Sequence, residues 1–156
     1  MNREDPAAPV RTQDPVSDED PLVLWELVQT AHLAARVLRE LFATVGLTPT
    51  QFGVLACLAD GDDFTKAELA RALMVRPQSM DPLIEALIAQ RLVERDGPPR
   101  RGRASGITIT ASGLDRLTRI RPQVSAANAP ERIGIEAETV PPLVAQLRTI
   151  RARLES

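Results

Sequence analysis

The feature that most constrains the fold is the stretch 65–110, where two short helices are predicted to be followed at once by a hairpin. Thr65 and Glu68 have the spacing of a capping box, in which each side chain bonds a backbone N–H at the start of a helix. Apolar residues at helical spacing predict the second helix: Leu83, Ile84, Leu87, Ile88 and Leu92. Segments 92–95 and 106–110 can pair as strands around a loop rich in Gly, Pro and Arg. This order predicts a winged helix-turn-helix, whose second helix can enter the major groove of DNA.

Composition supports a mainly α-helical fold. The 156 residues are enough for one domain with a real core, and 44% of them are apolar. Aromatic residues are only 3% and Tyr is absent, which favours helices packed through Leu, Val, Ile and Ala over a β-sandwich. The sequence has no run of 18 apolar residues and no signal-peptide pattern, so we expect no membrane contact and a cytoplasmic location. A single cysteine, Cys57, allows neither an internal disulfide nor a zinc site of several cysteines.

Charge is distributed unevenly along a chain whose net charge is −2. Residues 1–20 carry six acids against two arginines, a balance of −4, and have no periodic apolar pattern. We therefore predict a disordered acidic tail there. Residues 91–121 carry eight arginines against three acids, a balance of +5. Local charge decides where a polyanion can bind, so the net charge does not exclude a nucleic-acid partner.

Helices are also predicted on both sides of the central stretch. Residues 21–45 have apolar side chains at helical spacing, and Gly46 is expected to end this helix. The apolar side chains cover more of the helix surface than the single stripe that packing on one core requires. Surplus apolar surface of this kind usually packs against a second copy of the chain. A capping box at Thr48, with Pro49 in the first turn, opens the next helix. After the hairpin, Pro122 is expected to kink or end a helix, residues 123–137 are weakly patterned, and Val140–Leu154 predicts a last amphipathic helix.

One set of residues, spread over these predicted elements, forms a characteristic pattern of residue types and spacings. They are Leu47, Thr48, Gln51, Val54, Leu55, Lys66, Glu68, Leu69, Ala70, the runs 76–80 and 92–95, the arginine-rich turn, Ile109, Thr110 and Gly113. In this order and spacing, over roughly residues 22–155, the chain resembles the multiple-antibiotic-resistance (MarR) family of regulators. The resemblance implies a transcriptional regulator, usually a repressor, which acts as a homodimer on a pseudo-palindromic operator in double-stranded DNA. It also implies release by a small aromatic or phenolic anion.

The resemblance predicts the organisation of the chain. A tail at 1–20 precedes a single domain at 21–156. Segments 21–46 and 111–156 are expected to form the dimerisation helices, and 47–110 the DNA-binding region.

Candidate DNA contacts begin at the start of the second helix of the pair. They are Arg76, Pro77, Gln78, Ser79 and Met80, with Lys66 on the preceding helix. Gln can bond an adenine edge and Ser a base or a phosphate, whereas Lys66 and Arg76 are expected to bind phosphates. Met80 can contact a thymine methyl group or equally turn inward.

The hairpin loop supplies the second set of candidate contacts. Arg100, Arg101 and Arg103 flank Gly102 at its tip. Guanidinium groups on a narrow hairpin suit the minor groove, where the negative potential is strongest. We therefore predict that this wing inserts into DNA.

The dipeptide Asp81-Pro82 leaves two starts open for the second helix. If the helix begins at Pro77, Pro82 lies in its second turn and removes a hydrogen bond, at a cost of about 3 kcal/mol. If Asp81 is the N-cap and Pro82 the first helical residue, Gln78 and Ser79 lie in a loop. The earlier start, with local distortion, is favoured because the resemblance requires it.

The sequence also offers candidates for an effector pocket and for a redox site. Trp25, His32 and Arg36 can line an effector pocket by stacking, hydrogen bonding and carboxylate pairing, although interface packing and plain surface are the alternatives. Cys57 allows a redox-sensing regulator, against the alternative of a buried inert thiol. With one His and no phosphate-binding loop, we expect no enzyme, cofactor or metal. A winged-helix module that binds proteins and not DNA is the alternative function.

Overall fold

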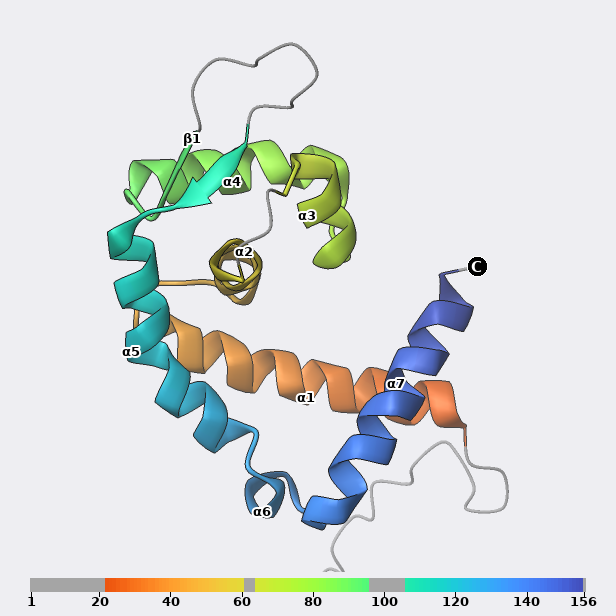
Figure 1. Cartoon of the computed structure of the whole chain (residues 1–156). Coiled ribbons are helices and arrows are strands. Elements are labelled where there is room, and N and C mark those ends of the chain that lie inside the picture. Colours follow the sequence, from red (N-terminus) through yellow and green to blue (C-terminus); the bar gives the residue numbers. More distant parts are fainter. Residues whose placement is uncertain (1–21, 61–63, 96–105, 156) are drawn as a thin grey trace, which may run out of the picture. The chain divides into compact units, whose positions relative to one another are not determined.

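The computed structural model describes residues 22–60, 64–95 and 106–155. These residues are mainly helical, with one antiparallel pair of strands, so the predicted fold class is confirmed (Figure 1). The α-helices are α1 Val23–Ala43, α2 Pro49–Ala59, α3 Lys66–Ala72, α4 Met80–Ala89, α5 Ala111–Ala127, α6 Pro130–Ile133 and α7 Val140–Leu154. Two 3-10 turns, η1 Pro77–Ser79 and η2 Ala137–Thr139, and the strands β1 Val93–Arg95 and β2 Ile107–Ile109 complete the elements. No helix in the described ranges is long and apolar enough to cross a membrane.

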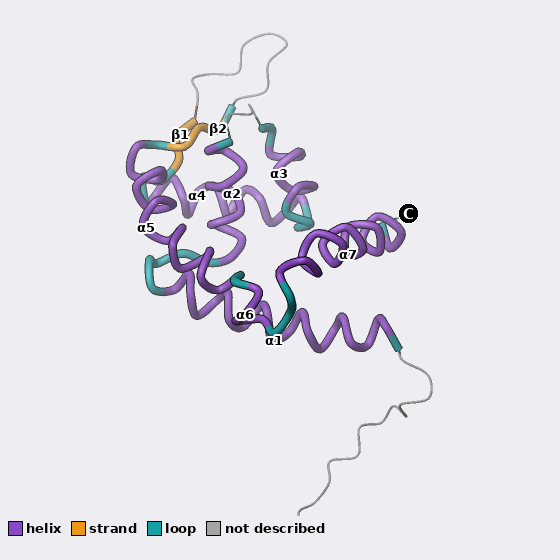
Figure 2. The backbone as a smooth tube through the Cα atoms, turned by 60° about the horizontal axis from the view of Figure 1, so that its bottom comes forward, coloured by secondary structure: helices purple, strands orange, loops and turns teal. Residues whose placement is uncertain are grey.

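The chain divides into two compact units, residues 1–36 and 37–156. In the first unit, the described residues form the N-terminal part of α1, and all but Leu27 and Ala35 are exposed. In the second unit, α2, α3, α4 and α5 gather beside the two strands (Figure 2). The predicted tail at 1–20 and the wing-tip arginines Arg100, Arg101 and Arg103 lie outside the described residues.

The core of the second unit is aliphatic and is centred on α2. Val54 and Leu55 of α2 are completely buried, as are Leu69 of α3 and Ile84 of α4. At the edge of this core, the rings of Phe42 and Phe52 stack with their centroids 4.4 Å apart. The core thereby holds α3 and α4, the two helices of the predicted helix-turn-helix, in place.

Both predicted capping boxes are present. Thr48 and Gln51 exchange bonds at the start of α2: the Thr48 amide donates to Gln51 Oε1 at 2.9 Å, and the Gln51 amide to Thr48 Oγ1 at 3.2 Å. Thr65 and Glu68 do the same for α3, at 2.8 and 3.2 Å. The Thr65 backbone N–H, and then its hydroxyl, lower the pKa of Glu68 because both bonds stabilise the carboxylate.

The start of α4 follows the favoured alternative in part, because helical structure begins at Pro77 but in a distorted form. The chain turns at Pro77 into the 3-10 segment η1, and the α-helix proper begins at Met80, with Ser79 at the N-cap position. Asp81 is therefore inside the first turn, and its prediction as N-cap is wrong. Pro82 is the third helical residue, where a backbone N–H has no partner inside the helix. The proline therefore costs no intrahelical hydrogen bond, and the predicted penalty does not arise.

The chain after the strands is more helical than predicted. Pro122 does not end α5, which continues to Ala127, and residues 123–137 include the rest of α5, all of α6 and the start of η2. Leu117 and Ile120 are buried before the proline, and Val124 packs on the core after it. Burial on both sides outweighs the hydrogen bond that a proline removes.

Candidate nucleic-acid interface

Helix α4 is held by one face and exposes the other. Met80, Ile84 and Leu87 occupy the inner face, and each is at most 1% exposed. Asp81 and Glu85 lie on the outer face and are exposed. Met80 therefore takes the inward orientation, and a side chain buried in this way offers no surface to a thymine methyl group.

The turn before α4 presents the other predicted contacts. Arg76, Pro77, Gln78 and Ser79 are consecutive and exposed. Met74 precedes them in the left-handed conformation with φ 54°, which the Val75 N–H to Ala70 carbonyl bond of 3.0 Å helps to hold. The structure thus brings the four residues together on one short exposed segment, and their contact with DNA stays a prediction.

Two ion pairs flank the exposed face of α4. Lys66 Nζ of α3 lies 2.5 Å from Asp81 Oδ1, and Arg95 of β1 pairs with Glu85. The hydrogen bond and charge of Lys66 lower the pKa of Asp81, so that its carboxylate is ionised at neutral pH. Lys66, predicted as a phosphate contact, therefore already has a partner. The sequence offered no signal for this pairing, because its partners lie 15 residues apart on different helices.

The strands β1 and β2, which form the base of the predicted wing, are linked to α5 by hydrogen bonds of Thr110. Val93 lies opposite Ile109 in the antiparallel register, as the predicted strands require. Thr110 donates through its hydroxyl to the Arg91 carbonyl at 2.7 Å and through its amide to the Leu92 carbonyl at 3.1 Å. Its hydroxyl also accepts a 3.1 Å bond from the Gly113 amide. One residue thus ties β2, the end of α4 and the start of α5 together.

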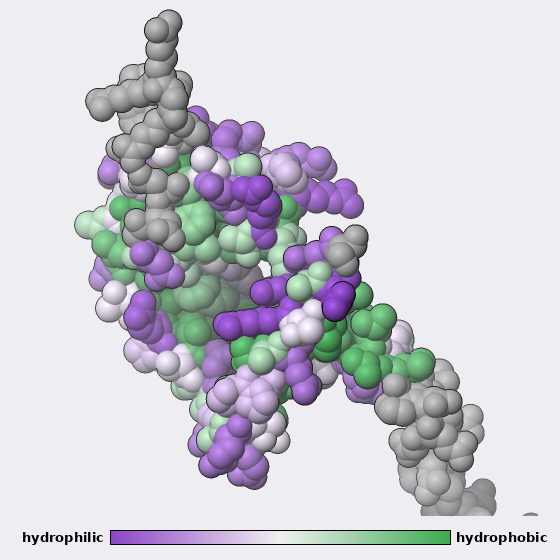
Figure 3. Space-filling model, turned by 45° about the vertical axis from the view of Figure 1, so that its right-hand side comes forward, coloured by the Kyte–Doolittle hydropathy of each residue, from purple (hydrophilic) through white to green (hydrophobic). Residues whose placement is uncertain are grey.

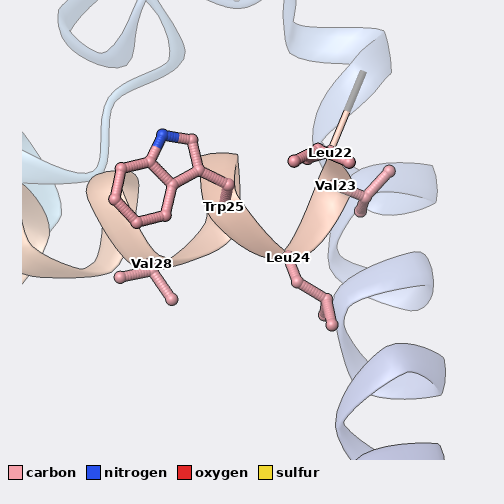
Figure 4. A pocket seen from close by; sticks show the side chains of 5 residues that line it. All are labelled: Leu22, Val23, Leu24, Trp25 and Val28. Atoms are coloured by element: carbon pink, nitrogen blue, oxygen red, sulfur yellow. The ribbon is translucent and has the colours of Figure 1, made fainter. Parts of the chain in front are cut away.

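The predicted effector residues of α1 are not gathered around one cavity. An open pocket of 440 Å³ is lined by Leu22, Val23, Leu24, Trp25 and Val28, all at the start of α1 (Figure 4). His32 and Arg36 are exposed and do not line it, and His32 Nδ1 lies 2.9 Å from the Val28 carbonyl oxygen. A hydrophobic surface is visible at this end of α1 in the space-filling view (Figure 3).

A second pocket, which the sequence did not predict, lies between α2 and α5. Its volume is 320 Å³, and the residues that line it are Phe52, Ala56, Ala59, Asp60, Leu117, Arg121, Val124 and Ser125. Arg121 is exposed and has no ion-pair partner among the described residues. The pocket therefore combines an apolar wall with an available guanidinium group. Only the packing of two helices that are far apart in sequence reveals it.

Cys57 lies half-buried on α2. Burial, and then the charge of Asp60, raise the pKa of its thiol. Because the thiolate is the reactive form, both effects disfavour the redox-sensing alternative. Within the described residues, no three His, Cys, Asp or Glu side chains are grouped so that they could hold a metal ion.

Known proteins resemble this chain in both sequence and structure. Residues 45–104 match the sequence model of the MarR family. The HTH-type transcriptional repressor Rv2887 of Mycobacterium tuberculosis is 34% identical over 85 residues, which are 54% of this chain and 61% of that protein. The match thus spans less than two thirds of that relative's length.

Solved structures show the same fold. The crystal structure of the M. tuberculosis MarR family protein Rv2887 in complex with salicylic acid has a TM-score of 0.66 and 25% identity, and covers 85% of this chain and 98% of that one. A mutant MarR from E. coli complexed with operator DNA has a TM-score of 0.69 and 21% identity, over 83% of this chain and 94% of that one. With the capped helix pair and the paired strands described above, these matches show that the chain has the fold of MarR family structures and is similar in sequence to that family over residues 45–104.

Proposed function

We propose that the chain is a sequence-specific DNA-binding transcriptional repressor. The observation that carries the proposal is the orientation of α4, whose apolar face is buried in the core while the turn at residues 76–79 remains exposed, as do Glu94 and Arg95 of β1. In helix-turn-helix proteins the second helix reads base edges with its N-terminal residues. The relative Rv2887 is named a transcriptional repressor, and a neighbour of the same fold is described with operator DNA.

The chain acts as a homodimer in this proposal. Helix α1 exposes large apolar side chains that a monomer would leave in water, among them Leu24, Trp25 and Leu33. Helix α7 likewise exposes Leu143, Val144 and Leu147 along one face. Such surplus apolar surface at the two ends of the chain suits burial against a second copy, which would present two winged modules to a pseudo-palindromic site.

The direct test is a fluorescence-anisotropy titration of the promoter region of the protein's own gene at several salt concentrations. Wild type is expected to bind tightly, with two chains per site, and to lose affinity as salt rises because phosphate contacts release counterions. Arg101→Ala/Arg103→Ala should lower the affinity by roughly tenfold or more, since hydrogen bonds to charged groups are lost. The loss should be nearly uniform across DNA sequences and should reduce the salt dependence.

The matched control replaces two arginines of the helices that follow the wing. Arg119 is paired with Asp115 at 2.9 Å on the surface of α5, and Arg132 is exposed on α6. Arg119→Ala/Arg132→Ala should leave the affinity nearly unchanged. If wild type binds no duplex even at low salt, DNA recognition is refuted, and the winged-helix module that binds proteins becomes the better reading.

A small aromatic carboxylate is the proposed effector, bound in the pocket between α2 and α5. Phe52, Leu117 and Val124 can pack against a ring, and Arg121 can pair with a carboxylate. The solved relative Rv2887 is described with salicylic acid, which has this chemistry. His32 and Arg36 line neither of the two pockets described above, so their part in effector binding stays a prediction.

Calorimetric titration of salicylate into two variants separates these candidate sites. Arg121→Gln should weaken binding by roughly tenfold, because a charge-assisted bond is lost, whereas Arg36→Gln should bind like wild type. The reverse result would move the site to α1. Added salicylate should also release wild type from DNA in the anisotropy assay, and unchanged DNA affinity at saturation would contradict its role as effector.

A further inference from the structure

We propose that Asp81 is a specificity-determining residue whose carboxylate accepts a hydrogen bond from the amino group of a cytosine in the major groove. The inference rests on the proposed DNA binding and names what one residue of that surface recognises. It begins from the position of Asp81 in the first turn of α4, directly after the exposed run Pro77–Ser79. This is the end of the helix that reads base edges in helix-turn-helix proteins.

The orientation of Asp81 follows from its buried neighbours. Met80 and Ile84 are buried in the core, and Asp81, next to Met80 in sequence, is turned about 100° round the helix from it and lies on the exposed flank of α4. Its side chain is 64% exposed although it is ion-paired. The carboxylate is therefore accessible to a large partner that approaches the outer face of α4.

The ionised carboxylate restricts which base it can contact. Without a proton it only accepts hydrogen bonds, and in the major groove only the amino groups of cytosine and adenine donate them. The adenine amino group lies between two acceptors, N7 of the same base and O4 of the paired thymine, which repel a carboxylate. The cytosine amino group has an acceptor on one side only, the O6 of the paired guanine. Cytosine is therefore the base that fits.

Lys66 explains how an acid can lie on a DNA-facing surface. Its ammonium group, 2.5 Å from Asp81 Oδ1, offsets the charge that phosphates would repel. An ammonium group has three N–H donors, so Lys66 can hold Asp81 and still donate to a phosphate. The ion pair with Asp81 is therefore compatible with the predicted contact of Lys66 with a phosphate. Because both side chains are about half exposed or more, the pair itself contributes little to stability.

Glu85 provides the matched control on the same helix. It lies one turn after Asp81, is also exposed, and is paired with Arg95 of β1. It is further from the N-terminal end of α4 that would reach the bases. Asp81 and Glu85 therefore share charge, face and pairing, and differ in their position along the helix.

The test is selection of binding sites from a randomised duplex library by full-length wild type, Asp81→Ala, Asp81→Asn and Glu85→Gln. Wild type should show a preference for cytosine at one position of each half-site, of roughly tenfold over other bases. Asp81→Ala should lose the preference at that position alone. Asp81→Asn should shift it towards adenine, which an amide can bind through N6 and N7. Glu85→Gln should retain the wild-type preference at every position.

Three results would overturn the inference. The first is an Asp81→Ala variant that binds all sequences more tightly with every base preference intact, because Asp81 would then only repel phosphate. The second is a Glu85→Gln variant that loses the same position. The third is a wild type that binds no duplex, which also refutes the proposed function, whereas the first two leave it standing. Thermal melting should show all variants folded, since both acids lie on the surface.

Discussion

Gly113→Ala is expected to lower the free energy of unfolding by about 3 kcal/mol, the upper part of the usual range for overpacked sites. An ideal Cβ at Gly113 would lie 2.3 Å from the Leu92 carbonyl oxygen and 2.7 Å from Ile109 Cγ1. The carbonyl cannot retreat freely, because it accepts the 3.1 Å bond from the Thr110 amide. The strain would therefore fall on the junction between β2 and α5. Urea unfolding followed by circular dichroism measures the loss.

Gly53→Ala is the matched control for this substitution. Its Cβ would meet Leu73 Cδ2 at 2.5 Å, but that atom is the end of a side chain that can rotate away. Alanine also has a helix propensity about 1 kcal/mol better than glycine in the interior of a helix such as α2. Gly53→Ala should therefore cost much less. Equal losses in the two variants would show that the backbone contact at Leu92 is not the cause.

Ile84→Ala is expected to cost between about 2 and 5 kcal/mol and to weaken DNA binding with it. Ile84 is completely buried and sits midway along the inner face of α4. The cavity that replaces it would loosen the helix whose outer face carries Asp81. The free energies of unfolding should be compared at one protein concentration, because the proposed dimerisation would make apparent stability depend on concentration, and the anisotropy titration measures the DNA affinity.

Ile88→Ala provides the comparison on the same helix. Ile88 is the same residue type one turn later, but it is only half-buried. It should lose less stability and retain DNA affinity. If Ile88→Ala were as destabilising as Ile84→Ala, the anchoring of α4 would not depend on the inner face described here.

Elements with local signals could be predicted from the sequence. The two capping boxes were exact, since each is made by residues three apart, Thr48 with Gln51 and Thr65 with Glu68. The last helix was predicted at its observed bounds, Val140–Leu154. The strands at the wing base were also correct, because alternation and turn residues are short-range patterns.

Prolines were harder to interpret because their effect depends on what surrounds them. Pro82 is harmless, since the 3-10 turn η1 moves the helix start and puts the proline in the first turn. Pro122 is tolerated inside α5 because buried residues on either side hold that helix against the core. The sequence shows the missing N–H in both cases, but it does not show the packing that offsets it.

The sequence alone determined the two capping boxes, the paired strands and the last helix, because these depend on hydrogen bonds and apolar spacing within a few residues. Tertiary structure decided the inward side chain of Met80, the pairing of Lys66 with Asp81 and the pocket at Arg121. Each of these depends on the distance between segments that the chain brings together only on folding. Periodicity within one element carries no information about such distances.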